Sequence, residues 1–274
     1  AYGLNWRLGR QTYKLGPIGL LFSEGSLNIF GGGSVGADGL VVKGSFGPLN
    51  FEAAGFTLIG MGSFGSINAL YSALMGRASM QLMPGWTLGA NIYSERCNGN
   101  CVAVFNSNGW SVDLAGTLIP GLTLQAEYAT FTPASIWGAF PDNTAYQVNT
   151  VFNLGQLTGM TQYSPTLRIQ YKKYGTNYVP LYRGGGDLYG LGFTNNYRAW
   201  NVQFSMTFSP LFRPYANYEA GTIISTGVAN NELELGFYSQ VTTGVTARFR
   251  YQRRESPAGT VATHRYRLQI DASW

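Results

Sequence analysis

Charged side chains are scarce in this sequence of 274 residues, where they make up 11% of the positions. An average soluble domain carries about 25% charged residues. The aromatic content of 15% excludes a disordered chain, which is poor in aromatic residues and rich in charge. Long blocks of Glu, Lys, Ala and Leu are missing as well, while glycine is abundant, and this combination excludes a long helical bundle. The composition therefore predicts an all-β protein.

Clusters of basic residues are also lacking. The formal net charge is +5 and the isoelectric point is about 9.2. No run of lysines and arginines and no basic helical pattern accompanies this charge. Nucleic-acid binding requires clustered cations, so we expect no nucleic-acid partner.

Cysteine and histidine are nearly absent. The two cysteines, Cys97 and Cys101, enclose an Asn-Gly-Asn spacer, and the single histidine is His264. A zinc site needs two further ligands at suitable spacing, so we expect neither a metal nor another cofactor. Hydrolases need a base close to a nucleophile, and Thr263 and Tyr266 suggest none beside His264. We therefore predict no catalytic residue and no enzymatic activity.

Long helical apolar segments are not predicted either. Residues 53–76 carry no charge, but five glycines and several serines interrupt them, which favours two strands joined by a loop. The first residues lack the basic and apolar regions of a signal peptide. We expect the chain to be a mature form or a piece of a longer one.

The strongest positive signal is the alternation of apolar and polar residues with a period of two. In residues 263–274, Tyr266, Leu268 and Ile270 alternate with Arg265, Arg267 and Gln269. A soluble sandwich also alternates, but its strands are usually five or six residues long and its surface is richer in Lys and Glu. The alternating segments here run to about ten residues, the length of a tilted strand that crosses a bilayer.

A sheet in lipid must close, because open edges would leave backbone groups unpaired. We therefore predict an all-β transmembrane antiparallel β-barrel of about 14 strands, in a single domain over residues 1–274. Short turns alternate with longer connections, which places both chain ends in the periplasm. The predicted strands are 1–10, 38–46, 49–59, 69–82, 86–94, 109–119, 121–131, 144–154, 165–174, 196–208, 212–222, 230–240, 244–255 and 261–274.

Two segments resemble known protein families. The last strand ends in Trp274 and resembles the C-terminal strand of bacterial outer-membrane proteins, which implies an outer-membrane location and recognition by the barrel assembly machinery. Leu8-Gly9-Arg10-Gln11-Thr12-Tyr13-Lys14-Leu15-Gly16, followed by Gly19-Leu20-Leu21-Phe22, is similar to a segment of the S-layer-homology-domain porins of the Deinococcus–Thermus group. This second resemblance implies that the chain is a compact relative or the C-terminal strands of a larger barrel.

The parity of the strands predicts which residues face the lumen. These are mostly polar, and the predicted pore-lining residues are Arg7, Lys43, Arg77, Arg168, Lys172, Glu232, Glu234, Arg248, Arg250, Arg265 and Arg267. A polar lining is typical of a water-filled channel, and an excess of arginine favours anions. The charges also have a purely structural interpretation, in which Glu232 and Glu234 pair with Arg248 and Arg250 across the strands.

We therefore expect a porin that lets ions and small hydrophilic solutes diffuse through the outer membrane, with a mild anion preference. The alternative is the barrel portion of an S-layer-linked structural protein that anchors the cell envelope. Membrane lipid, small solutes, the assembly machinery and an S-layer or second copy are the expected partners. The loop of residues 174–195 is expected either to fold inward and narrow the pore or to remain outside.

The two cysteines give a first testable prediction. Because an Asn-Gly-Asn spacer favours a tight turn, Cys97 and Cys101 should form a disulfide in an external loop, as expected in an oxidising compartment. A membrane-impermeant thiol reagent should not label whole cells unless a reductant is added first. Ready labelling without reductant would show two free thiols instead.

Overall fold

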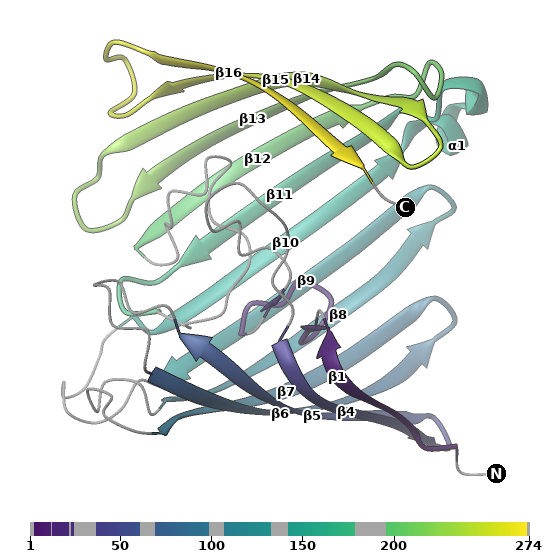
Figure 1. The fold of residues 1–274 in the computed structure, drawn as a ribbon, viewed down its shortest axis with the longest axis vertical. Helices are drawn as coiled ribbons and strands as arrows, with labels where there is room; N and C mark the ends of the chain where they lie inside the picture. Colours follow the sequence, from purple (N-terminus) through teal and green to yellow (C-terminus); the bar gives the residue numbers. More distant parts are fainter. Residues whose placement is uncertain are drawn as a thin grey trace. The chain divides into compact units, whose positions relative to one another are not determined.

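The computed structural model describes residues 3–11, 13–21, 23–24, 37–60, 69–98, 107–132, 142–178 and 196–272 (Figure 1). The chain divides into two compact units. The first comprises Ala1–Gly116, Gln125–Gln147 and Tyr174–Asn196, and the second comprises Thr117–Leu124, Val148–Lys173 and Tyr197–Trp274.

Fourteen strands form one antiparallel sheet whose order follows the sequence, as the alternation predicts. The strands are β1 (Asn5–Gln11), β4 (Ala37–Phe46), β5 (Leu49–Gly60), β6 (Ala69–Met83), β7 (Trp86–Asn98), β8 (Ser107–Ile119), β9 (Leu122–Thr132), β10 (Thr144–Asn153), β11 (Thr166–Tyr174), β12 (Tyr197–Ser205), β13 (Arg213–Ile223), β14 (Ala229–Thr242), β15 (Val245–Glu255) and β16 (Thr263–Ala272). A separate ribbon joins β2 (Tyr13–Lys14) to β3 (Ser23–Glu24).

Four of the short turns between neighbouring strands use a glycine with a positive φ angle. These angles are 59° at Gly47, 80° at Gly85, 88° at Gly121 and 83° at Gly244. A residue with a Cβ atom is strained in that region of backbone conformation, whereas glycine is not. The glycines therefore permit the tight reversals that set the register of each hairpin.

Several predicted strand ends differ from the structure by a few residues, and one connection has structure of its own. The strand predicted over residues 196–208 ends at Ser205, because Thr207 donates its amide to Tyr163 instead of continuing the ladder. The unusually long connection at 155–164 contains α1 (Leu154–Thr158) and a 3₁₀ turn (Thr161–Tyr163). Asn153 caps α1, since its side-chain oxygen accepts the amide of Gln156 at 3.1 Å.

The exposure of the two sheet faces is reversed relative to that of a soluble protein. Large apolar side chains are exposed, with Ile92 at 66% and Leu268 at 68%. Charged side chains of the opposite face are buried, with Glu127 and Glu234 both at 2%. Soluble proteins almost never bury such residues fully unless they are paired. The outward apolar face is thus suited to lipid, and the polar side chains face inward.

The second unit shows this arrangement through a continuous register. Tyr197 to Ser205 of β12 lie opposite Ile223 to Tyr215 of β13, and β13, β14, β15 and β16 follow in the same antiparallel way. Trp200 and Tyr171 place their rings 4.7 Å apart, so aromatic side chains cover part of the outward face. Among the described residues, no helix is long and apolar enough to cross a membrane.

The reversal of the two faces predicts opposite tolerances for neighbouring residues. Val202 lies on the outward face near the middle of β12, and Gln203 lies on the inward face beside Asn217. Val202→Arg should destabilise the protein by roughly 2–4 kcal/mol in a lipid bilayer, because it places a cation in hydrocarbon. Gln203→Arg is the matched control and should cost far less. Urea unfolding in lipid vesicles, followed by tryptophan fluorescence, measures both. Equal losses would contradict the assignment of the two faces.

Candidate functional site

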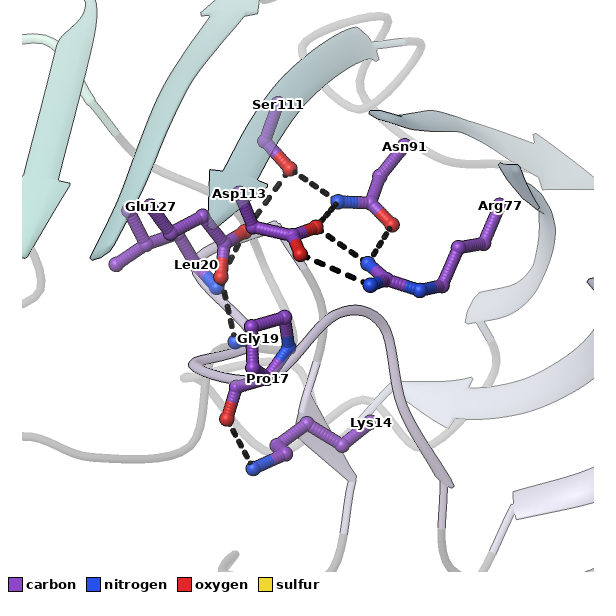
Figure 2. Close-up of polar contacts among 9 residues, drawn as sticks. All are labelled: Lys14, Pro17, Gly19, Leu20, Arg77, Asn91, Ser111, Asp113 and Glu127. Atoms are coloured by element: carbon purple, nitrogen blue, oxygen red, sulfur yellow. Dashed lines mark hydrogen bonds and ion pairs between the residues drawn. The ribbon is translucent and has the colours of Figure 1, made fainter. Parts of the chain in front are cut away.

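The segment Tyr13–Leu21 folds over the inward face of β6–β9 in the first unit (Figure 2). Gly16 and Gly19 have φ angles of 79° and 80°, so both positions favour glycine. The Lys14 Nζ donates to the carbonyl oxygen of Pro17 at 2.5 Å and closes the segment on itself. Three leucines, Leu15, Leu20 and Leu21, are at most 1% exposed.

The Glu127 carboxylate holds the backbone of this segment. Its Oε2 accepts the amide of Gly19 at 2.9 Å, and its Oε1 accepts the amide of Leu20 at 3.3 Å. The Ser111 hydroxyl also donates to Oε1 at 2.9 Å. Hydrogen bonds to an ionised group are stronger than those between neutral groups. A buried carboxylate with three donors can therefore keep the segment against the sheet.

Tyr178 fixes the same segment from another direction. Its hydroxyl donates to the carbonyl oxygen of Leu20 at 2.7 Å, and its side chain is fully buried. The Tyr178 ring lies edge-on to Phe131, with 6.2 Å between the ring centroids. The Leu20 amide is therefore bound by Glu127 and the Leu20 carbonyl oxygen by Tyr178. Tyr178 belongs to the loop that the sequence expects either to fold into the pore or to remain external. Of this loop the structure describes residues up to 178, and residues 179–195 are not among the described ones.

A row of polar side chains continues from Glu127 across three strands. Asn91 donates to the Ser111 oxygen at 2.9 Å and to Asp113 Oδ2 at 2.8 Å, and accepts from Arg77 at 2.8 Å. The Arg77 guanidinium binds Asp113 through two nitrogens, one of them at 2.8 Å from Oδ1. Figure 2 shows this chain of contacts running from Arg77 to Glu127, with Gly19 and Pro17 below it in the view.

A glycine on the strand between them makes room for the Arg77–Asp113 pair. Gly89 of β7 lies opposite Asp113, and a Cβ atom there would come within 2.5 Å of the Arg77 Nη2 and 2.6 Å of the Asp113 Oδ2. The guanidinium therefore passes directly over the backbone of β7. Gly16 rests on the pair, because a Cβ at that position would lie 3.2 Å from Arg77 Nη1.

Tyr13 and Leu21, at the two ends of the segment, pack on an apolar part of the inward face. Tyr13 and Phe56 place their ring centroids 5.2 Å apart. Gly109 leaves space for Leu21, since a Cβ at Gly109 would lie 2.6 Å from the Leu21 Cδ2. The buried apolar residues of the first unit, including Ala73, Met75 and Tyr93, thus form a core inside the sheet. Burial of the three leucines there adds hydrophobic stabilisation to the hydrogen bonds.

The second unit contains a separate charged cluster around Glu219. The Glu219 Oε2 accepts from Lys172 at 2.8 Å and from Asn201 at 3.2 Å, while Oε1 accepts from Tyr197 at 3.0 Å. Glu232 lies directly opposite Glu219 in the register of β13 and β14. Lys172 is 4% exposed, and its charge is compensated by the ion pair with Glu219.

Glu234 organises the arginines of β15. Its Oε1 binds Arg248 at 2.8 Å and accepts a hydrogen bond from the Tyr215 hydroxyl at 2.7 Å. Its Oε2 lies 3.7 Å from Arg250 and accepts a hydrogen bond from Gln252 at 2.8 Å. The predicted pairing with Arg248 and Arg250 is therefore present for Glu234. It is wrong for Glu232, which lies opposite Arg254 in the register and 3.5 Å from its Nε.

The remaining predicted lining residues are dispersed over the inward face. Lys43 is exposed and binds Glu52 at 2.8 Å, and Arg7 lies opposite Val41. Arg265 lies opposite Gln252, and Arg267 lies opposite Arg250. Arg168 makes no ion pair among the described residues. Pore lining by these residues stays a prediction.

Two other predictions concern the two cysteines and the single histidine. Cys101 and the side chain of Cys97 lie outside the described residues, so their disulfide stays a prediction. His264 is exposed, and its Nδ1 lies 2.9 Å from the Tyr251 hydroxyl.

The sequence reasoning missed the docking of Tyr13–Leu21 and the part that Glu127 and Tyr178 play in it. A signal for the docking is present in the sequence. The inward parity of β6, β7 and β9 is interrupted by Met75, Tyr93 and Phe131, which have no reason to be apolar if they face water. The connection after β1 supplies the matching leucines.

Comparisons with known proteins identify the fold. The outer-membrane protein OprD of Pseudomonas aeruginosa matches with a TM-score of 0.60 at 13% identity, over 98% of this chain and 74% of that one. OccK10 (OpdN) of the same organism gives a TM-score of 0.66 at 12% identity, over 99% of this chain and 80% of that one. OpdL gives 0.63 at 14% identity, over 98% and 77%.

This chain has the same fold as those proteins. The prediction of an antiparallel β-barrel with 14 strands is thereby confirmed. No protein-family model matches the sequence, and no curated protein matches it either.

The docked segment gives a prediction about Glu127. Glu127→Ala removes the acceptor of the Gly19 and Leu20 amides and should raise the hydrogen-exchange rates of both at least tenfold, because bonds to charged groups contribute about 1.5–3 kcal/mol each. Hydrogen exchange followed by mass spectrometry of the peptide over residues 13–21 measures this. Glu234→Ala, which removes a buried carboxylate of the second unit, is the control. Unchanged exchange in Glu127→Ala would show that other contacts hold the segment.

Proposed function

We propose that this protein is a porin of the bacterial outer membrane, through which ions and small hydrophilic solutes diffuse passively. The observation that carries the proposal is the reversal of the two faces, with exposed apolar side chains outward and carboxylates and guanidinium groups inward. In a membrane barrel a polar interior is the wall of a water-filled channel. The shared fold with the outer-membrane protein OprD supports the location.

A mild preference for anions is the finer part of this proposal. Arg250 lies directly opposite Arg267, and like charges in that position repel each other. Glu234 lies near Arg250, but it also binds Arg248. Arg168 is half-buried and has no acidic partner among the described residues. Cations thus exceed carboxylates on the inward face of the second unit, and an anion in the channel would relieve their repulsion.

The docked segment Tyr13–Leu21 should narrow the channel. It is held to the inward face of the first unit by Glu127, where it would occupy part of a water-filled lumen. Its outer surface includes the Lys14 side chain, which is exposed. The segment therefore favours small solutes over large ones.

The alternative function is an S-layer-linked structural protein that anchors the envelope. It rests on the resemblance of Leu8–Gly16 and Gly19–Phe22 to the S-layer-homology-domain porins. Partnership with an S-layer, with a second copy or with the assembly machinery remains part of these proposals. A chain that only anchors would have no need of a conducting path, so conductance separates the two functions.

Conductance and selectivity in planar bilayers test the proposed function. The purified, folded protein should give discrete channels. In a salt gradient, the sign of the reversal potential should show that anions are more permeant than cations. This preference should weaken as salt rises, because the Debye length falls from about 10 Å at 0.1 M to about 3 Å at 1 M. Absence of conductance from folded protein would contradict the porin function.

Paired variants test which arginines set the selectivity. Arg248→Ser with Arg250→Ser, and separately Arg168→Ser, should shift the reversal potential toward cations, because each removes inward positive charge. Arg198→Ser is the control, since Arg198 shares the outward face of β12 with Trp200. An equal shift in the control, or none in the inward variants, would show that these arginines do not line the path.

A further inference from the structure

The outward face of β6–β9 contains a groove of about 450 Å³. Ile92 and Trp110 lie opposite each other in the register of β7 and β8, and both are exposed. The next row toward the 99–106 connection consists of Leu74, Ser94 and Asn108. All of these residues belong to the first unit and line the groove. The groove is thus apolar at one end and increasingly polar toward the loops.

A cation stands at the polar end of the groove. Arg96 is exposed, follows Ser94 on the outward face of β7, and lies opposite Ser72. Its Nη2 donates to the Asn108 oxygen at 3.4 Å, and its Nη1 donates to the Glu95 carbonyl at 3.1 Å. Asn108 itself lines the groove, so the guanidinium lies beside the opening.

No carboxylate of the described residues pairs with this guanidinium on the outward face. Arg96 makes no ion pair among the described residues. The Glu95 side chain points inward, where the Tyr93 hydroxyl donates to its carboxylate at 2.5 Å. The connections at 61–68, 99–106 and 133–141 contain no Asp or Glu. This arginine at the edge of an apolar face therefore has N–H donors that an external anion can use.

We propose that this groove binds one anionic membrane lipid with a phosphate headgroup. One acyl chain lies along Ile92, Trp110 and Leu74, and the phosphate binds Arg96 while Ser94 and Asn108 supply further polar contacts. A guanidinium forms two parallel hydrogen bonds with a phosphate. A zwitterionic phospholipid has the same phosphate, but its own cation compensates that charge, so an anionic lipid gains more from Arg96. The combination of an apolar groove and a cation at its rim selects an amphiphile of this charge. The inference needs the outward face to lie in lipid, but it does not need the channel to conduct.

Tryptophan quenching by brominated lipids tests the proposal, because bromine on an acyl chain quenches a nearby indole. The protein is reconstituted in vesicles of unlabelled phosphatidylcholine, and brominated phosphatidylglycerol or brominated phosphatidylcholine is titrated in. Trp110→Phe identifies the part of the signal that comes from the groove. The brominated anionic lipid should quench the Trp110 component at a concentration at least roughly fivefold lower than the zwitterionic lipid, as one arginine near a membrane surface implies.

Two variants and a control complete the design. Arg96→Gln should remove the preference for the anionic lipid, and Ser94→Phe should fill the groove and weaken quenching by both lipids. Arg198→Gln changes another exposed arginine of the outward face and should leave the preference intact. All variants are first checked for the folded state by the shift of unheated samples in gel electrophoresis.

Several results would overturn the proposal. Equal quenching by both lipids in the wild type would mean that the groove contacts bulk lipid without selecting a headgroup. Loss of the preference in Arg198→Gln as well as in Arg96→Gln would mean that it reflects general surface charge. Protection of Trp110 that rises with the protein-to-lipid ratio would mean that a second copy of the chain covers the groove.

Discussion

The structure depends on one constraint, which is that a strand in lipid must satisfy its backbone within the sheet and turn its polar side chains away from hydrocarbon. The alternation of side chains meets this constraint along nearly every strand. Ile92 and Trp110 face outward, whereas Asn91 and Ser111, one position away on the same strands, are buried in hydrogen bonds. A shift of register by one residue would exchange the two sets, so the glycine turns that fix the hairpins also protect the separation of the faces.

Buried carboxylates organise the inward face that this constraint creates. A buried charge is costly unless it is paired and hydrogen-bonded, and each of these acids has several partners. Glu127 binds backbone amides of the docked segment, Glu219 binds Lys172 and two neutral donors, and Glu234 binds Arg248 and Tyr215. The carboxylates thereby hold cations and a loop segment in place.

The fold could be predicted closely because its cause is local. The period of two needs only neighbouring residues, and glycine turns mark where each strand ends, so 14 strands were predicted with boundaries near those of the structure. The site was predicted only in part. Parity places Arg77, Lys172 and Glu234 on the inward face, but it cannot tell which acid each cation meets, because diagonal contacts such as Arg77–Asp113 cross a strand above Gly89. The docking of Tyr13–Leu21 depends on residues that are 107 and 158 positions away from Leu20, which no local pattern reveals.

The central claim is that the apolar face of the strands meets lipid, while the opposite face, where the docked segment does not cover it, meets water. Spin labels placed one at a time along residues 198–204 of β12, in a cysteine-free background in lipid vesicles, test this most directly. Collision with oxygen, which concentrates in hydrocarbon, and with a water-soluble nickel complex should both vary with a period of two, and the two patterns should be opposite in phase. Oxygen should dominate at Trp200, Val202 and Phe204, and nickel at Asn201 and Gln203. Patterns in phase, or water access on both faces, would contradict the account.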